Sequence, residues 1–265
     1  MNSYRRITWT IVLTCLCACQ SSNSTIQPKP PSEPILSFSN DDWGKVLAKV
    51  ATPDGYVRWD QLQSDQDTRD ALSKYIGLLS VVSPVNQPSL FVDANDAKAY
   101  WINAYNALAI YWVTQHEYPG TIPSQRPDQF LVGGKPMRLS DIEALLQSDF
   151  KDRMATFALN GCARSDPPLR DTPYDGAVLD AQLVDQAHRY LSDPRGVRRD
   201  GNTIILALPL LPFVSEAAQS SASGATIRGL GALLPYAQGD SPLQNIADVR
   251  NVQFGFDYTL NRPPR

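Results

Sequence analysis

The sequence predicts an α+β fold: a single helix-rich domain built around a buried central helix, with a small antiparallel sheet. Residues 100–113 are all apolar or aromatic except Asn103 and Asn106, and a helix that is apolar on every side is buried on every side. Several other segments repeat apolar residues at helical spacing, whereas only short segments alternate as strands do. The 265 residues, 43% of them hydrophobic, suffice for one sizeable core.

The N-terminus resembles an export signal that ends in a lipid-attachment site. Arg5 and Arg6 precede an apolar run of secretory-signal length. The run ends in the letters LCAC, similar to a bacterial lipobox, whose last cysteine is acylated and becomes the new N-terminus. We therefore expect residues 1–18 to be a lipoprotein signal peptide and Cys19 to be lipidated. An ordinary signal peptide with incidental cysteines is the alternative.

The residues after the cysteine indicate where the protein resides. Gln20 stands where an Asp would retain an enterobacterial lipoprotein in the inner membrane, so by this resemblance we expect an outer-membrane anchor with the domain facing the periplasm. Residues 19–37 are rich in Ser, Pro and Gln without periodicity, which predicts a disordered tether. Residues 38–265 contain no second linker and no internal repeat, so we expect one globular domain.

The first half of this domain is expected to be mainly helical. Apolar spacing predicts a capped amphipathic helix over 43–50, preceded by residues 40–42, and a second helix over 67–82. Residues 55–59 read as a turn into a short strand. Asp93 is placed to cap the central helix, which we expect to end near His116.

The second half mixes hairpins and helices. Residues 130–139 look like a hairpin that turns at two glycines, and Ser140 to Glu143 match a capping box that opens a helix to about residue 148. Helical spacing returns over 178–192. A hairpin over 196–206, helices over 209–219 and 226–237, and a strand of strict alternation over 252–261 complete the chain.

Composition argues against several functional classes. The net charge is −3, the pI is near 5.4 and no basic patch stands out, so nucleic acid is not an expected partner. His116 and His188 are the only histidines and lie far apart, so we expect no metal site. No phosphate-binding or dinucleotide-binding motif is present, and no cofactor is expected. Cys162 is the only cysteine of the body, which leaves no partner for an intramolecular disulfide.

Two groups of polar residues are candidates for ligand binding. Asn103 and Asn106 share a helix face, and their amides either line a pocket or hold loops to the core, because a buried amide needs hydrogen-bond partners. Arg164 projects from the rigid loop 158–170 and could grip a carboxylate, or it could pair at the surface with Asp166 or Asp171.

Two residues are candidates for catalysis. Glu143 could act as a general acid or base, but as the fourth residue of the capping box it could equally cap its helix. Cys162 suggests a thiol nucleophile, although neither histidine is visibly oriented as its base.

Four segments in this order resemble one protein family. They read KAYWINAYNAL, FLVGGKPMRLSDIE, FALNGCARSDPPL and FDYTLN, and they resemble the five-hundred-and-forty-seventh "domain of unknown function" family, which is found in bacteria and also in plants. The resemblance covers about residues 40–262 and implies no activity. It retains Asn103, Tyr105, Asn106, Glu143, Asn160 and Arg164.

The chain departs from the family pattern where chemistry would be expected. Ala144 and Thr156 stand where many members have histidine, and Gly161 and Asp166 stand at the two cysteine positions of the loop. Cysteine- or histidine-based chemistry of relatives is therefore not carried over to this chain.

Two functional hypotheses follow. The first is a lipid-anchored binding or assembly module of the cell envelope, with a polar pocket beside the central helix and an envelope protein or peptidoglycan as partner. The second is an envelope hydrolase or transferase acting on amide bonds such as those of peptidoglycan stem peptides. In that case Glu143 would be the base, and Asn103, Asn106, Asn160 and Arg164 would hold the ligand.

Overall fold

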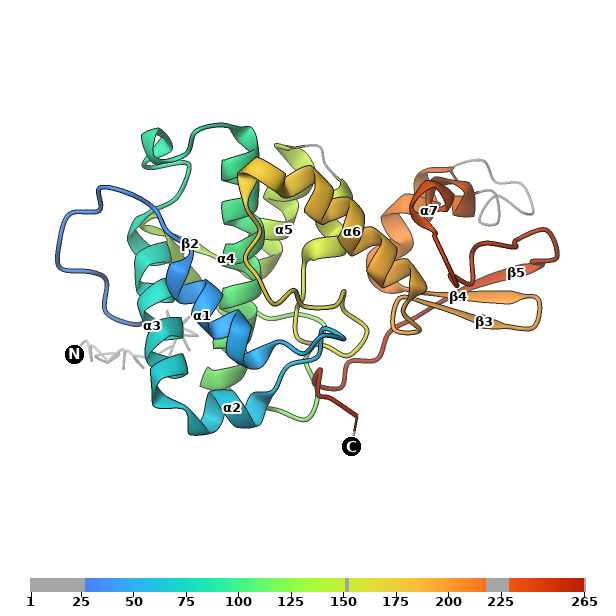
Figure 1. Cartoon of the computed structure of the whole chain (residues 1–265), viewed down its shortest axis with the longest axis horizontal. Coiled ribbons are helices and arrows are strands. Elements are labelled where there is room, and N and C mark those ends of the chain that lie inside the picture. Colours follow the sequence, from blue (N-terminus) through green and yellow to red (C-terminus); the bar gives the residue numbers. More distant parts are fainter. Residues whose placement is uncertain (1–26, 151–152, 218–228, 265) are drawn as a thin grey trace, which may run out of the picture.

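The computed structural model describes residues 27–150, 153–217 and 229–264 and confirms a helix-rich α+β fold (Figure 1). The α-helices are α1 (Asp41–Val50), α2 (Trp59–Ser64), α3 (Gln66–Val81), α4 (Ala94–Gln115), α5 (Leu139–Ser148), α6 (Leu179–Ser192) and α7 (Leu211–Ala217). The strands are β1 (Phe130–Val132), β2 (Lys135–Met137), β3 (Val197–Asp200), β4 (Thr203–Ala207) and β5 (Asn251–Gly255). A 3₁₀ helix, η2 (Arg153–Ala158), follows α5.

Helix α4 is the central helix that the sequence predicts. Every residue from Lys98 to Val113 is buried, and Figure 1 shows α3 and α5 on opposite sides of it, both in contact with it. The Asp93 carboxylate accepts hydrogen bonds from the N–H groups of Asn95 at 2.8 Å and Asp96 at 3.0 Å, so the expected cap is present.

The strands form two separate sheets. β1 and β2 make the expected hairpin, with both turn glycines at positive φ. β3 and β4 make the second expected hairpin, and β5 joins β4 in parallel. The expectation of a purely antiparallel sheet is therefore wrong for this strand. β5 is joined to β4 by a long connection instead of a hairpin turn, and such a connection permits a parallel pair.

Two segments expected as strands are shorter than predicted. The alternating segment 252–261 leaves the sheet after Gly255, and its end forms isolated bridges from Thr259 to Thr121 and from Leu260 to Ala163. Alternation persists beyond β5 because the tail packs on loops of the helical part. At residues 55–59 a single bridge, Ala51 to Val57, stands in place of a strand, and α2 begins at Trp59.

Apolar side chains gather in two clusters. The larger surrounds α4 and includes residues of α1, α3, α5 and the loop after η2. The smaller contains Phe157, Tyr190 and Ile204 and lies between the end of α6, the three-stranded sheet and α7. Met154 and Phe256 pack against both clusters. The boundary between the clusters is where the pockets described below open.

The predicted signal peptide, Cys19 and the first part of the predicted tether lie outside the described residues. Residues 27–40 form no helix or strand, and Gln27 donates a hydrogen bond to the Leu131 carbonyl at 3.0 Å. Within the described ranges, no helix has the length and apolarity needed to cross a membrane. Of the helices expected over 209–219 and 226–237, α7 is present and short 3₁₀ turns follow residue 229, while residues 218–228 are not described.

Candidate functional site

Two buried asparagines of α4, Asn103 and Asn106, hold the loop between η2 and α6 to the core. Asn103 exchanges two hydrogen bonds with the backbone of Tyr174, accepting from its N–H at 2.9 Å and donating to its carbonyl at 2.8 Å. Asn106 accepts from the Asn160 N–H at 2.7 Å and donates to the Ala158 carbonyl at 2.9 Å. Each amide therefore satisfies two backbone groups that would otherwise be buried without partners.

Asn160 has the same role within the loop. Its side chain donates to the Pro167 carbonyl at 2.6 Å and accepts from the Cys162 N–H at 3.0 Å. All three asparagines are almost completely buried. Their amides are engaged with the backbone, and none of the three lines the pocket that the structure forms beside α4.

That pocket, hereafter the α4 pocket, has a volume of about 280 Å³. It opens between α4, α5, the loop before β1, the loop after η2 and the chain tail. Its polar lining residues are Tyr105, Ser124, Arg126, Glu143, Gln147, Thr156, Asp166 and Tyr258. Its remaining lining residues are Ile122, Pro123, Leu159, Ala163, Leu208, Pro209, Pro212 and Phe256. The pocket thus joins a polar region to an apolar wall, as ligand sites commonly do.

Three polar groups of this pocket surround Gly161. A Cβ added to Gly161 would lie 2.9 Å from Nη2 of Arg126, 3.0 Å from Oδ2 of Asp166 and 3.3 Å from the Tyr105 hydroxyl. Arg126 Nη1 donates to the Gly161 carbonyl at 3.1 Å, and the guanidinium lies 5.4 Å from the Trp112 ring. A guanidinium, a carboxyl and a phenol therefore meet at one place, because a glycine leaves room for them.

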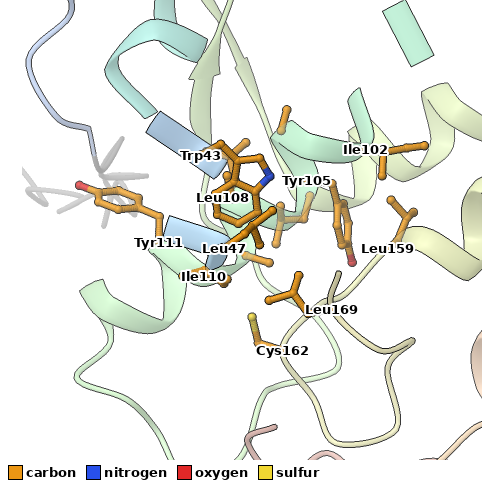
Figure 2. Packing of buried hydrophobic residues seen from close by; sticks show 14 of the residues in the cluster. Trp43, Leu47, Ile102, Tyr105, Leu108, Ile110, Tyr111, Leu159, Cys162 and Leu169 are labelled. Atoms are coloured by element: carbon orange, nitrogen blue, oxygen red, sulfur yellow. The ribbon is translucent and has the colours of Figure 1, made fainter. Parts of the chain in front are cut away.

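Figure 2 shows how Tyr105 reaches this place. Its ring lies beside Ile102 and Leu159 in the larger apolar cluster, and its hydroxyl points away from Ile102. Burial raises the pKa of the phenol, the positive charge of Arg126 opposes this, and the carboxyls of Glu143 and Asp166 add to it. The phenol therefore stays protonated and can donate a hydrogen bond.

Asp166 is a buried carboxyl with an altered pKa. It is 9% exposed, and its Oδ2 accepts from the Ala163 N–H at 2.7 Å. Burial raises its pKa to about 7, against the opposing effects of that hydrogen bond and of the Arg126 charge, while Glu143 raises it further. A carboxyl that titrates near neutral pH can both donate and accept protons.

Glu143 lines the same pocket. The interpretation of Glu143 as a helix cap is wrong: α5 begins at Leu139, and Asp141 accepts the Arg138 N–H at 2.8 Å in that role. The box lies two positions earlier than the motif suggests, at Arg138 to Asp141 instead of Ser140 to Glu143. The Glu143 side chain reaches solvent. Protein atoms packed around its carboxyl nevertheless raise the pKa of this group, and the charge of Arg126 opposes the rise. Glu143 is thereby available to a ligand.

Arg164 lies in a different cavity from Glu143. Its guanidinium is 5.5 Å from the Tyr56 ring, and its Nη1 is 3.5 Å from the Arg262 carbonyl. It does not line the α4 pocket. Of the five predicted ligand-binding residues, only Glu143 lines the α4 pocket. The structure adds Tyr105, Arg126 and Asp166 to its lining.

Cys162 is placed among core side chains. It is fully buried at φ +72°, and Figure 2 shows it near Leu169. Burial raises the pKa of its thiol, only partly opposed by Arg126, so a thiolate nucleophile is disfavoured. His116 stacks on Trp112 with its Nε2 3.8 Å from Asp128. Among the described residues, no three His, Cys, Asp or Glu side chains gather as metal ligands would.

Comparison with known proteins supports the family resemblance over part of the chain. Residues 91–191 match the family model described as "Protein of unknown function, DUF547". This range includes α4, β1, β2, α5 and the loop that carries Asp166. No curated protein and no solved structure matches the chain.

Proposed function

We propose that this chain, whose residues 91–191 match the DUF547 family model, is a lipid-anchored protein of the bacterial cell envelope that binds a small peptide-like ligand in the α4 pocket. The observation that carries the proposal is the convergence of Tyr105, Arg126 and Asp166 around Gly161 at the polar end of this pocket.

The anchor is inferred from the sequence alone. Arg5, Arg6, the apolar run to residue 18 and the small residues before Cys19 have the order of a lipoprotein signal. Acylated Cys19 and the following tether would hold the domain near the outer membrane, facing the periplasm. Peptidoglycan and other envelope proteins are the partners within reach there.

The lining of the α4 pocket suits a short peptide with a free carboxylate. Arg126 carries several N–H donors in a planar fork, which matches the two oxygens of a carboxylate. Tyr105 and protonated Asp166 can donate further hydrogen bonds to it. The apolar wall of Leu208, Pro209 and Phe256 can cover aliphatic side chains. Peptidoglycan stem peptides combine these features.

A titration tests this proposal. The full-length chain in non-ionic detergent is titrated calorimetrically with a stem tetrapeptide that has a free C-terminal carboxylate, and with its C-terminal amide. We expect saturable binding of the acid, and binding at least about tenfold weaker for Arg126→Gln, because one charge-assisted hydrogen bond contributes about 1.5–3 kcal/mol. Lys135→Gln removes the same charge from β2, outside the pocket lining, and should bind as the wild type does.

Two results of the titration would contradict the proposal. Equal binding of acid and amide, or equal effects of the two substitutions, would contradict the assignment of Arg126 to a ligand carboxylate. Asp166→Asn serves as a second variant if Arg126→Gln unfolds, because the amide oxygen can keep the hydrogen bond from Ala163.

A second candidate is hydrolysis of an amide bond in the same pocket. It is favoured by the two carboxyls, Asp166 with a pKa of about 7 and Glu143 with a raised pKa, whose different environments suit an acid and a base. Mass spectrometry of the tetrapeptide after incubation distinguishes the two. Cleavage that is lost in both Asp166→Asn and Glu143→Gln supports hydrolysis, and an intact peptide supports binding.

A further inference from the structure

A second cavity, hereafter the arginine pocket, lies beyond Phe256, which lines both cavities. It has a volume of about 330 Å³. Its walls come from the loop after η2, the turn between α6 and β3, β4 and the start of the chain tail. Three arginines from two segments line it: Arg164 from the loop after η2, and Arg195 and Arg198 from the turn into β3 and β3 itself.

Arg195 is the buried member of this group. Its side chain is 6% exposed. Its Nε and Nη2 hold the Asp193 carboxylate, at 2.9 Å and 2.6 Å, and Nη2 also donates to the Asp54 carbonyl. Nη1 is buried and has no hydrogen-bond partner within the part of the chain that the structure describes. A buried N–H of a charged group without a partner is costly, and a bound anion would satisfy it.

The other two arginines bring further positive charge to the same place. The guanidinium of Arg195 lies 4.2 Å from the Tyr56 ring, and that of Arg164 lies 5.5 Å from the same ring. Arg198 is exposed on β3, opposite Ile205 of β4, which also lines the pocket. Like charges held this close repel one another unless a negative charge lies between them.

The acidic groups nearby leave a surplus of positive charge. Asp193 is held by Arg195. Burial would raise the pKa of Asp257, but hydrogen bonds from Thr259 and the charges of Arg164 and Arg198 lower it, so this carboxylate stays ionised. Of the described residues that line the pocket, one is acidic, Asp257, and three are arginines.

We propose that the arginine pocket binds a phosphoryl group. A single arginine suffices for a planar carboxylate, whereas three guanidinium groups around one cavity suit the tetrahedral oxygens of a phosphate. Ser165, whose hydroxyl accepts the Asp257 N–H at 2.8 Å, can donate one more hydrogen bond. The phosphoryl group could be free phosphate or belong to a lipid headgroup, and the experiment distinguishes these sources.

The test uses calorimetric titration of the full-length chain in non-ionic detergent with three probes: inorganic phosphate, the soluble headgroup diester glycerophosphoglycerol, and acetate. We expect saturable binding of at least one phosphorus probe and about tenfold weaker binding in Arg198→Gln. Arg199→Gln is the matched control: it removes the same charge from the adjacent residue of β3, whose side chain points to the other face and pairs with Asp248. Arg164→Gln repeats the test if Arg198→Gln fails to fold.

Tight binding of phosphate alone indicates free phosphate as the ligand, and binding of the diester indicates a lipid headgroup. Either result supports the proposal when it depends on Arg198 and not on Arg199. The proposal is overturned if neither probe saturates, if acetate binds as tightly as phosphate, or if the two substitutions weaken binding equally. Stem-peptide binding in the α4 pocket should be unchanged in Arg198→Gln, so the two sites are tested independently.

Discussion

Replacing Asn106 by alanine tests how the loop after η2 is held to the central helix. The substitution removes both hydrogen bonds of the amide and leaves the Ala158 carbonyl and the Asn160 N–H buried without their partners. Each unsatisfied group costs about 1–3 kcal/mol, so we expect a loss of about 2–6 kcal/mol in the free energy of unfolding. This is a large fraction of the roughly 5–15 kcal/mol typical of a domain.

The assay is urea unfolding of the full-length chain in non-ionic detergent, followed by tryptophan fluorescence. Asn95→Ala is the matched control, because Asn95 lies in the first turn of the same helix and is only half-buried. We expect it to cost less than about 0.5 kcal/mol. A loss below about 1 kcal/mol for Asn106→Ala, or equal losses for both variants, would refute the structural role assigned to Asn106.

Three further outcomes are expected. Because the folded-state pKa of Asp166 is raised from 3.8 to about 7, the folded state binds more protons than the unfolded state between these values, so this group's contribution to stability is lost as pH rises from about 4 to about 7. Urea unfolding across that range should show this decline in the wild type relative to Asp166→Asn, and parallel pH profiles would contradict it. Gly161→Ala would place a Cβ 2.9 Å from Nη2 of Arg126 and 3.0 Å from Oδ2 of Asp166, so calorimetry should show weaker stem-peptide binding, whereas unchanged affinity would exclude this arrangement. Cys162→Ser should leave the affinity for the stem peptide unchanged. The buried thiol of the native chain should resist iodoacetamide until urea unfolds the protein. Rapid alkylation of the native chain, measured by mass spectrometry, would show instead that the thiol is accessible.

The sequence was sufficient to predict the central helix, because its pattern is local. Residues 100–113 are apolar on every side, and Asp93 is a standard cap. The two hairpins were predictable for the same reason, since paired glycines and Asp200-Gly201 signal tight turns within a few residues. The direction of β5 was not predictable, because its partner strand is about 45 residues away and no turn fixes the pairing.

The partners of the buried amides were only partly predictable. The loop that carries Asn160 does supply a partner to Asn106, in line with the expectation that these amides hold loops to the core. Asn103 binds Tyr174, which lies beyond any of the motifs. The capping-box motif from Ser140 to Glu143 made a cap one of two interpretations of Glu143, but Asp141 closes the box in the structure.

The main residues of the α4 pocket escaped sequence reasoning. Arg126 lies in a proline-containing segment without periodicity, so only the tertiary fold places it beside Asp166 and Tyr105. Asp166 resembled a surface partner of Arg164, but the loop turns its carboxyl inward to the Ala163 N–H. Tyr105 resembled core packing, and only its hydroxyl leaves the core. The available signals were the family resemblance at Tyr105 and the glycine at position 161.

The most direct test of a ligand site at the α4 pocket is a ¹³C NMR pH titration of the Asp166 carboxyl in the full-length chain, with and without the stem tetrapeptide. We expect an apparent pKa near 7 in the free protein and a clear change of this value when the peptide carboxylate binds beside Arg126. A carboxyl that titrates near 4, or whose pKa is the same with and without saturating peptide, would contradict the assignment.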